Sequence, residues 1–222
     1  MSGAKVCRIA KDAFHLSETY EFLGIDGPAL AVVRHALFKD VPCLILSMVT
    51  IVECSAEWPR DFIAHRIGRI PVRNMDRHGG VTDGQGAVFE VHVAAPSEHD
   101  APCRITVVTS KDFVLRRGRD LASAEATLVH ACSPAEAALT GDRGLQVVCL
   151  LPGQKIRALA TASRGTGRES PRWTCVHVAQ LEYEPRRILR VRPLGSVTAA
   201  RALVSALRAT RARLQAVLEA TG

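Results

Sequence analysis

The chain has 222 residues, of which 47% are apolar and 23% are charged, and its formal net charge is +7. This composition is typical of a globular protein with a core and argues against a disordered chain. The positive balance favours polyanionic partners, either nucleic acid or an acidic protein surface. No stretch approaches 18 uninterrupted apolar residues, so no transmembrane helix is predicted.

The seven cysteines are scattered, their number is odd, and no two of them have CxxC spacing. This pattern favours free thiols in a reducing compartment over a disulfide framework or a zinc site. The N-terminus lacks the apolar segment of a secretory signal. We therefore expect the protein on the nuclear or cytoplasmic side of the cell.

The first 42 residues read as two strands followed by a helix. The strands fall within residues 5–25, where aromatic side chains alternate with polar ones. Asp26 and Pro28 suit the start of the helix, with the proline in its first turn. Over residues 29–39 the apolar side chains recur at helical spacing and need a partner surface; they are Leu30, Val33 and Leu37.

The middle of the chain is dominated by strand patterns. Residues 43–54 form an apolar, β-branched run typical of a buried strand. Asp61 fits the N-cap of a short helix that ends at Gly68. Further strands are predicted at 87–95, 103–109 and 145–151, a glycine-rich loop at 74–86, and irregular structure at 116–144.

The last part of the chain predicts two strands and a long helix. The strands lie within residues 152–183 and flank a loop rich in glycine and arginine at 164–172. Residues 198–220 have the pattern of an amphipathic helix whose apolar stripe needs more cover than this chain supplies. We expect Arg201, Arg208 and Arg211 outside that stripe, which comprises Leu203, Ala206, Leu207, Thr210, Leu214, Val217 and Leu218.

Nothing in the sequence has the pattern of an active site. The glycines of RGTGR at 164–168 lack the flanking lysine and the strand–loop–helix context of a phosphate loop, so a turn between strands is the better interpretation. The histidines do not cluster at metal-binding spacing, and we expect Cys43, Cys54 and His65 to be structural. No catalytic residue, cofactor or metal is predicted.

One segment carries a specific resemblance. The sequence DFIAHRIGRIPV at 61–72 resembles the signature D-E-F-I-A-H-R-L-G-L-I-P-L of the alpha-like, third-largest subunit of archaeal and eukaryotic DNA-directed RNA polymerases. Other stretches resemble that family in the same order along the chain; they are residues 20–42, 109–114, 152–173 and 191–218.

The resemblance implies an α+β fold with a discontinuous dimerisation domain of one sheet and two helices. Residues 1–42 and 180–222 would form that domain, and residues 43–179 would form an inserted, mainly β domain. Such a subunit has no chemistry of its own within the nucleotidyltransferase complex. It heterodimerises with a small L-like or eleventh-type subunit and docks the second-largest subunit, so DNA is reached only through the complex.

The resemblance also implies two sets of contact residues. The dimerisation contacts would be Leu30, Val33, Arg34, Leu37, Leu203, Leu207, Leu214 and Leu218. The large-subunit contacts would be Asp61, Phe62, His65 and Arg66.

The chain departs from the family pattern at several points. Ala31 and His35 replace an asparagine and the second of two arginines on the first helix. No four-cysteine loop follows Met75–Asp76, so no zinc site is expected there. The high Ala and Arg content indicates a GC-rich genome and fits a large DNA virus, in which case the protein would reside in cytoplasm or virion instead of the nucleus. The alternative function is a stand-alone, basic nucleic-acid-binding module that reuses the fold.

Overall fold

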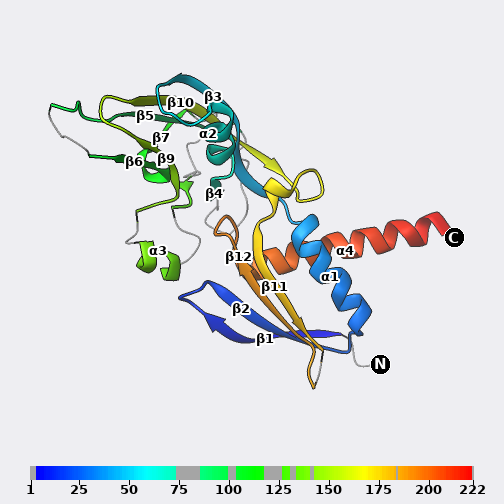
Figure 1. Ribbon diagram of the computed structural model, residues 1–222. Helices are drawn as coiled ribbons and strands as arrows, with labels where there is room; N and C mark the ends of the chain where they lie inside the picture. The colour runs from blue at the N-terminus through cyan, green and yellow to red at the C-terminus, as the bar shows by residue number, and fades with distance from the viewer. Residues whose placement is uncertain are drawn as a thin grey trace. The chain divides into compact units, whose positions relative to one another are not determined.

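The computed structural model describes residues 4–73, 86–99, 104–117, 127–130, 134–140, 143–183 and 185–221. Helices and sheets are mixed along the chain, which confirms the α+β class (Figure 1). The chain divides into two compact units, and the first of them is discontinuous in sequence. Unit 1 comprises residues 1–43, 132–135 and 165–222, and unit 2 comprises 44–131 and 136–164.

This division differs from the expected one at its second boundary. The resemblance places the end of the inserted domain after residue 179, whereas unit 2 ends after residue 164. The physical reason is strand pairing. Strand β11 (Val176–Glu182) pairs with β12 (Ile188–Pro193), so it belongs to the sheet of unit 1.

Unit 1 is a four-stranded antiparallel sheet with two helices. The strand order is β1-β2-β12-β11, with β1 at Lys5–Asp12 and β2 at Ser17–Leu23. Helix α1 (Gly27–Lys39) packs on β11 and on helix α4 (Ala199–Thr221), which in turn packs on β12 and β2. The helical turn η2 (Pro171–Trp173) precedes β11.

The start of α1 is set by local chemistry, as the sequence predicts. Asp26 is the N-cap and its carboxylate accepts a hydrogen bond from the backbone N–H of Ala29 (2.9 Å), while Pro28 lies in the first turn. The apolar stripe of α1 is buried within unit 1. The prediction that this stripe needs a second polypeptide was therefore wrong: β11 and α4 of the same chain cover it.

Unit 2 is built on a six-stranded sheet and a two-stranded sheet. The first has the order β7-β5-β10-β3-β4-β8, and the second pairs β6 with β9. The strands are β3 (Cys43–Cys54), β4 (Pro71–Arg73), β5 (Val88–Ala94), β6 (Thr106–Thr109), β7 (Phe113–Arg117), β8 (Thr127–Leu128), β9 (Gln146–Leu150) and β10 (Lys155–Gly165). The other elements are α2 (Arg60–Ile67), the helical turn η1 (Ser110–Asp112) and α3 (Pro134–Thr140).

The predicted strands are found, with differences in burial and at two element ends. Strand β3 is buried over its first four residues only and then alternates, because one face of its second half is open to solvent. Helix α2 begins at Arg60, so Asp61 lies in its first turn and is not the N-cap. The predicted irregular stretch at 116–144 contains β8 and α3 in its described part. Except for Gly86, the predicted loop at 74–86 lies outside the described residues.

The core of unit 2 explains why these elements form. Alternate residues of β10 point into it, together with two isoleucines of α2. The fully buried members include Leu46, Ile63, Ile67, Val91, Leu150 and Ile156. Within the described ranges, none of the helices combines the length and the hydrophobicity that a membrane crossing requires.

Candidate interaction surfaces

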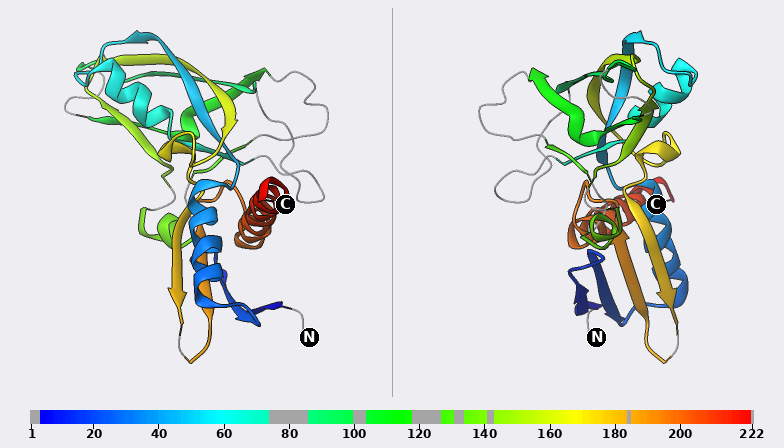
Figure 2. Two further views of the ribbon diagram at one scale, coloured as in Figure 1. Left: turned by 90° about the vertical axis from the view of Figure 1, so that its right-hand side faces the viewer. Right: turned by 60° about the vertical axis from the view of Figure 1, so that its left-hand side comes forward.

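Helix α4 has two halves with different surroundings. Its first half is anchored in unit 1 through Ala199, Ala202, Leu203, Ala206 and Thr210, all buried. From Arg211 to Thr221 every residue is exposed. Figure 1 shows this C-terminal half extending past α1, and in the left view of Figure 2 the helix is seen nearly end-on beside α1. The second half of α4 is therefore left open to solvent by the described residues.

The exposed half is amphipathic nonetheless. Leu214, Val217 and Leu218 are 60%, 59% and 70% exposed. Their spacing places them on one face of the helix. Most helical stability in proteins comes from packing of such a face, and the described residues leave this apolar face unpacked.

The structure separates the residues expected to form the dimerisation contact. Leu214 and Leu218 are exposed and Leu207 is partly exposed, so these three are available for contact. Arg34 is also on the surface, where its Nε–H donates to the carbonyl oxygen of Ala179 (3.1 Å). The remaining four are buried inside unit 1 and are not available in the isolated chain: Leu30, Val33, Leu37 and Leu203.

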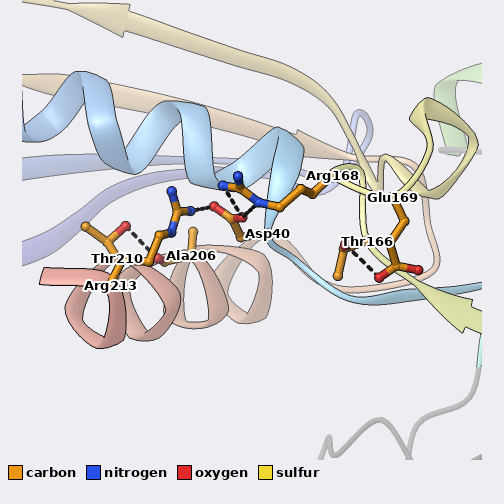
Figure 3. Close-up of polar contacts among 7 residues, drawn as sticks. All are labelled: Asp40, Thr166, Arg168, Glu169, Ala206, Thr210 and Arg213. Atoms are coloured by element: carbon orange, nitrogen blue, oxygen red, sulfur yellow. Dashed lines mark hydrogen bonds and ion pairs between the residues drawn. The ribbon is translucent and has the colours of Figure 1, made fainter. Parts of the chain in front are cut away.

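An ion cluster holds α4 at the point where its cover ends (Figure 3). Asp40, the C-cap of α1, has a carboxylate that is only 10% exposed. It accepts from the Nε of Arg168 (3.0 Å) and pairs with the guanidinium of Arg213 on α4. An acidic side chain at a helix C-terminus is opposed by the helix dipole, and the two arginines offset that cost. The cluster ties together α1, the loop before η2 and the exposed half of α4.

The glycines of the same loop allow close packing against neighbouring residues. A Cβ atom on Gly167 would lie 2.0 Å from the carbonyl oxygen of Phe38, and one on Gly165 would lie 2.4 Å from the ring of Trp173. The loop can lie against α1 only because Gly167 lacks a side chain, and the missing side chain at Gly165 leaves room for the ring of Trp173. These contacts account for the glycines of RGTGR without a phosphate.

A second surface is formed by α2 in unit 2. Ile63 and Ile67 are fully buried and fix the helix on the core, whereas Asp61, Phe62 and His65 are exposed. The expected large-subunit contacts on α2 therefore share a surface, with Arg66 partly buried beside them.

Arg66 is held in place by three neighbours. Its guanidinium lies 5.6 Å from the ring centroid of Trp58 and 5.9 Å from that of Phe62, which is cation–π geometry. It also donates to the carbonyl oxygen of Gln146 (2.7 Å). The two rings meet edge to face with centroids 5.4 Å apart. The α2 surface is thus an ordered aromatic and cationic cluster, half of whose Phe62 side chain is open to contact.

Of the two thiols expected to be structural, Cys43 is buried and Cys54 is partly buried, and Cys175 is buried as well. Cys43 donates its S–H to the carbonyl oxygen of Trp173 (2.9 Å), and burial raises the pKa of this thiol well above its usual value. Burial also raises the pKa of the Cys175 thiol to about 12. Because the thiolate is the reactive form, neither group is a nucleophile at neutral pH. Across the described ranges, no three His, Cys, Asp or Glu side chains gather as a metal site would require.

Two proteins of known identity are similar to this sequence, although no protein-family model matches it. The DNA-directed RNA polymerase II subunit rpb3 of Dictyostelium discoideum is 24% identical over 169 residues, which cover 74% of this chain and 53% of the relative. The subunit 3 of DNA-directed RNA polymerases II, IV and V of Arabidopsis thaliana is 23% identical over 184 residues, 77% of this chain and 54% of the relative. Over about three quarters of its length, the chain is thus similar to the third subunits of eukaryotic RNA polymerases.

The chain spans about half the length of the two relatives it matches. The similarity therefore supports a relationship to the alpha-like subunits, while the partners and the role of this protein are proposals.

Sequence reasoning missed the cluster of Asp40, Arg168 and Arg213. No local pattern signals it, since Asp40 and Arg168 are 128 positions apart and meet only in the folded chain. It also misplaced Arg211. That residue lies between Leu207 and Leu214 at spacings of four and three, which puts it on their face of α4.

Proposed function

We propose that this alpha-like chain is a non-catalytic assembly subunit of a multisubunit DNA-directed RNA polymerase. In this role it heterodimerises with a small, L-like or eleventh-type subunit, which covers the exposed half of α4. The observation that carries the proposal is the run from Arg211 to Thr221, a helix with an apolar face and no cover. Sequence similarity to polymerase third subunits supplies the context.

The proposed contact with the small subunit involves fewer residues than the sequence alone implies. The stripe of α1 is used inside unit 1, so α1 supports α4 instead of meeting the partner. Asp40 and Arg213 hold the exposed half of α4 in a defined direction. A helix presented in this way pays less ordering entropy on binding than a flexible tail.

The second-largest subunit is proposed to dock on the α2 surface of unit 2. Phe62 offers an exposed aromatic ring backed by Trp58, and Arg66 is already oriented by both rings. Aromatic and arginine side chains of this kind dominate many protein interfaces. With both contacts made, the chain would work as an assembly platform, and its proposed location is the nucleus, where polymerase II acts.

The first prediction concerns the exposed leucines of α4. Leu214→Arg places an unpaired charge in the proposed interface, which costs several kcal/mol and should abolish co-purification with a co-expressed small subunit. Arg208→Ala, outside the apolar face of Leu207, Leu214 and Leu218, is the matched control and should leave co-purification unchanged. Phe62→Ala should release the second-largest subunit while the small subunit is retained.

Two outcomes would contradict the proposal. One is that Leu214→Arg and Arg208→Ala behave alike, which would mean that α4 is not the contact surface. The other is that the unmodified chain stays monomeric in the presence of every candidate small subunit.

A further inference from the structure

Helix α4 carries a second stripe beside the buried one. We call it the exposed seam, and its members are Val204, Leu207, Arg211, Leu214 and Leu218. They are separated alternately by three and four positions, which is the a/d spacing of a coiled coil. Val204 is 45% exposed and Leu207 partly exposed, so the seam is open from the anchored half of the helix to its end.

Arg211 lies at the centre of this seam. Its neighbour Arg213 pairs with Asp40 and so is already neutralised. Arg211 itself is exposed, and it makes no ion pair or hydrogen bond with the described residues. Arg208 lies beside the seam, four positions after Val204 and three before Arg211, while Glu219 lies outside the seam. The seam therefore consists of four apolar side chains around one unneutralised cation.

A helix that covers the seam must accommodate that cation. A guanidinium enclosed among leucines without a counter-charge is strongly unfavourable, whereas a facing carboxylate can pair with it through two hydrogen bonds. A single polar residue at such a position also specifies which partner and which register are accepted.

A second copy of this chain would bind unfavourably to the exposed seam. The seam is nearly symmetric about Arg211, with Leu207 and Leu214 on either side and Val204 and Leu218 beyond them. Two such helices paired in register, parallel or antiparallel, would bring their Arg211 side chains together. Like charges facing each other across an interface are strongly disfavoured.

We propose that the exposed seam accepts an amphipathic helix of a different polypeptide, whose own apolar stripe carries one Asp or Glu opposite Arg211. The proposal rests on the proposed function and extends it to the chemistry of the partner. Arg211 is then the residue that selects this partner and rejects a second copy.

The test uses the full chain and three designed helical peptides of about three heptads, a length suited to this seam. The peptides have identical leucine stripes and differ only at the central stripe position, which is Glu, Leu or Lys. Because the variable position is central, it meets Arg211 in either orientation. Binding is measured by fluorescence anisotropy at low salt.

We expect the Glu peptide to bind at least about tenfold more tightly than the Lys peptide. Arg211→Glu should invert that order, whereas the control Ala212→Glu, at an exposed position outside the seam, should preserve it. Circular dichroism of each variant checks that the helix content is unchanged. Equal affinities for the Glu and Lys peptides, no measurable binding of any peptide, or inversion by Ala212→Glu would overturn the proposal.

The peptide-binding experiment and the co-purification test of the proposed function can give negative results independently of each other. Preference for the Glu peptide without co-purification of polymerase subunits would retain the selective seam and reject the polymerase role. Co-purification without any charge preference would retain the polymerase role and reject selection by Arg211.

Discussion

Gly167 brings its backbone against the carbonyl group of Phe38, at a point where any side chain would collide with main-chain atoms. The next residue, Arg168, donates its backbone N–H to the carbonyl oxygen of Lys39 (2.9 Å) and its side chain to Asp40. One position without a Cβ atom thus permits a hydrogen bond and an ion pair that hold the loop on the end of α1.

Gly167→Ala should therefore destabilise the protein. The added methyl group forces the loop and α1 apart, at a cost of about 1–3 kcal/mol, as for overpacking elsewhere. The urea midpoint measures the loss. Thr166→Ala in the same loop is the control, because it removes only one exposed hydrogen bond to Glu169, worth about 1 kcal/mol or less. Equal losses in the two variants would show that the space at Gly167 is not limiting.

Glu90 is a buried carboxylate on β5 whose charge is balanced by arginines. It accepts a hydrogen bond from the Nε of Arg157 (2.9 Å) and also pairs with Arg116. The hydrogen bond from Arg157, followed by the charge of Arg116, holds the pKa of Glu90 below its usual value.

That shift makes the stability of the protein depend on pH. Since the pKa of Glu90 is lower in the folded state, its contribution is fully present above the unfolded pKa and is lost as pH falls through the folded pKa. We expect Glu90→Gln to flatten the decline of the urea midpoint between neutral pH and about pH 3, across the usual carboxyl pKa. Glu98→Gln, at an exposed position, should keep the decline of the parent; a decline unaltered by Glu90→Gln would contradict the assignment.

Among the secondary-structure elements, helix α4 carries one amphipathic pattern that is buried in its first half and exposed in its second half. Leu203 and Leu214 belong to the same continuous helix, yet Leu203 is buried and Leu214 is mostly exposed. The difference lies in what stands opposite: β12, β2 and α1 lie against the first half, and nothing in the described chain covers the second.

The two halves should respond differently to the same change. Leu203→Ala opens a cavity in unit 1 and should lower the free energy of unfolding by about 2–5 kcal/mol. Leu214→Ala removes exposed atoms only, so its effect should stay within about 0.5 kcal/mol. Urea denaturation of the isolated chain distinguishes them. A large loss with Leu214→Ala would mean that the second half of α4 is covered by its own chain.

At the scale of the whole molecule, the chain leaves unit 1 after β3 begins and returns to it near the end of β10. Each unit has its own sheet and its own buried residues. The two proposed docking surfaces are divided between them, with α4 in unit 1 and α2 in unit 2. Separate units with separate surfaces suit a protein that holds two partners at once.

Some of the positively charged side chains of the molecule form ion pairs with carboxylates of the same chain. Arg116, Arg157, Arg168 and Arg213 all pair with Glu90 or Asp40. The net charge of +7 already counts these two carboxylates, so the pairing leaves the total unchanged and decides only where the charge lies. Arg211 differs from these arginines, because it lies in a surface where a partner is expected.

The local features of this protein can be predicted from its amino-acid sequence. The N-cap at Asp26, the strand at 43–54 and the long helix at 198–220 depend on neighbouring residues and on periodicity, which can be read directly. The motif at 61–72 pointed to the polymerase family, which the similar proteins support.

Which apolar faces are buried inside the chain becomes visible in the folded molecule alone. Helical periodicity shows that Leu30 and Leu218 each lie on an apolar face, but whether another segment covers that face depends on strands and helices distant in sequence. Burial therefore assigned α1 to the core of unit 1 and left the end of α4 open. For the same reason the meeting of Asp40 with Arg168 and Arg213 followed from long-range packing and from no local pattern.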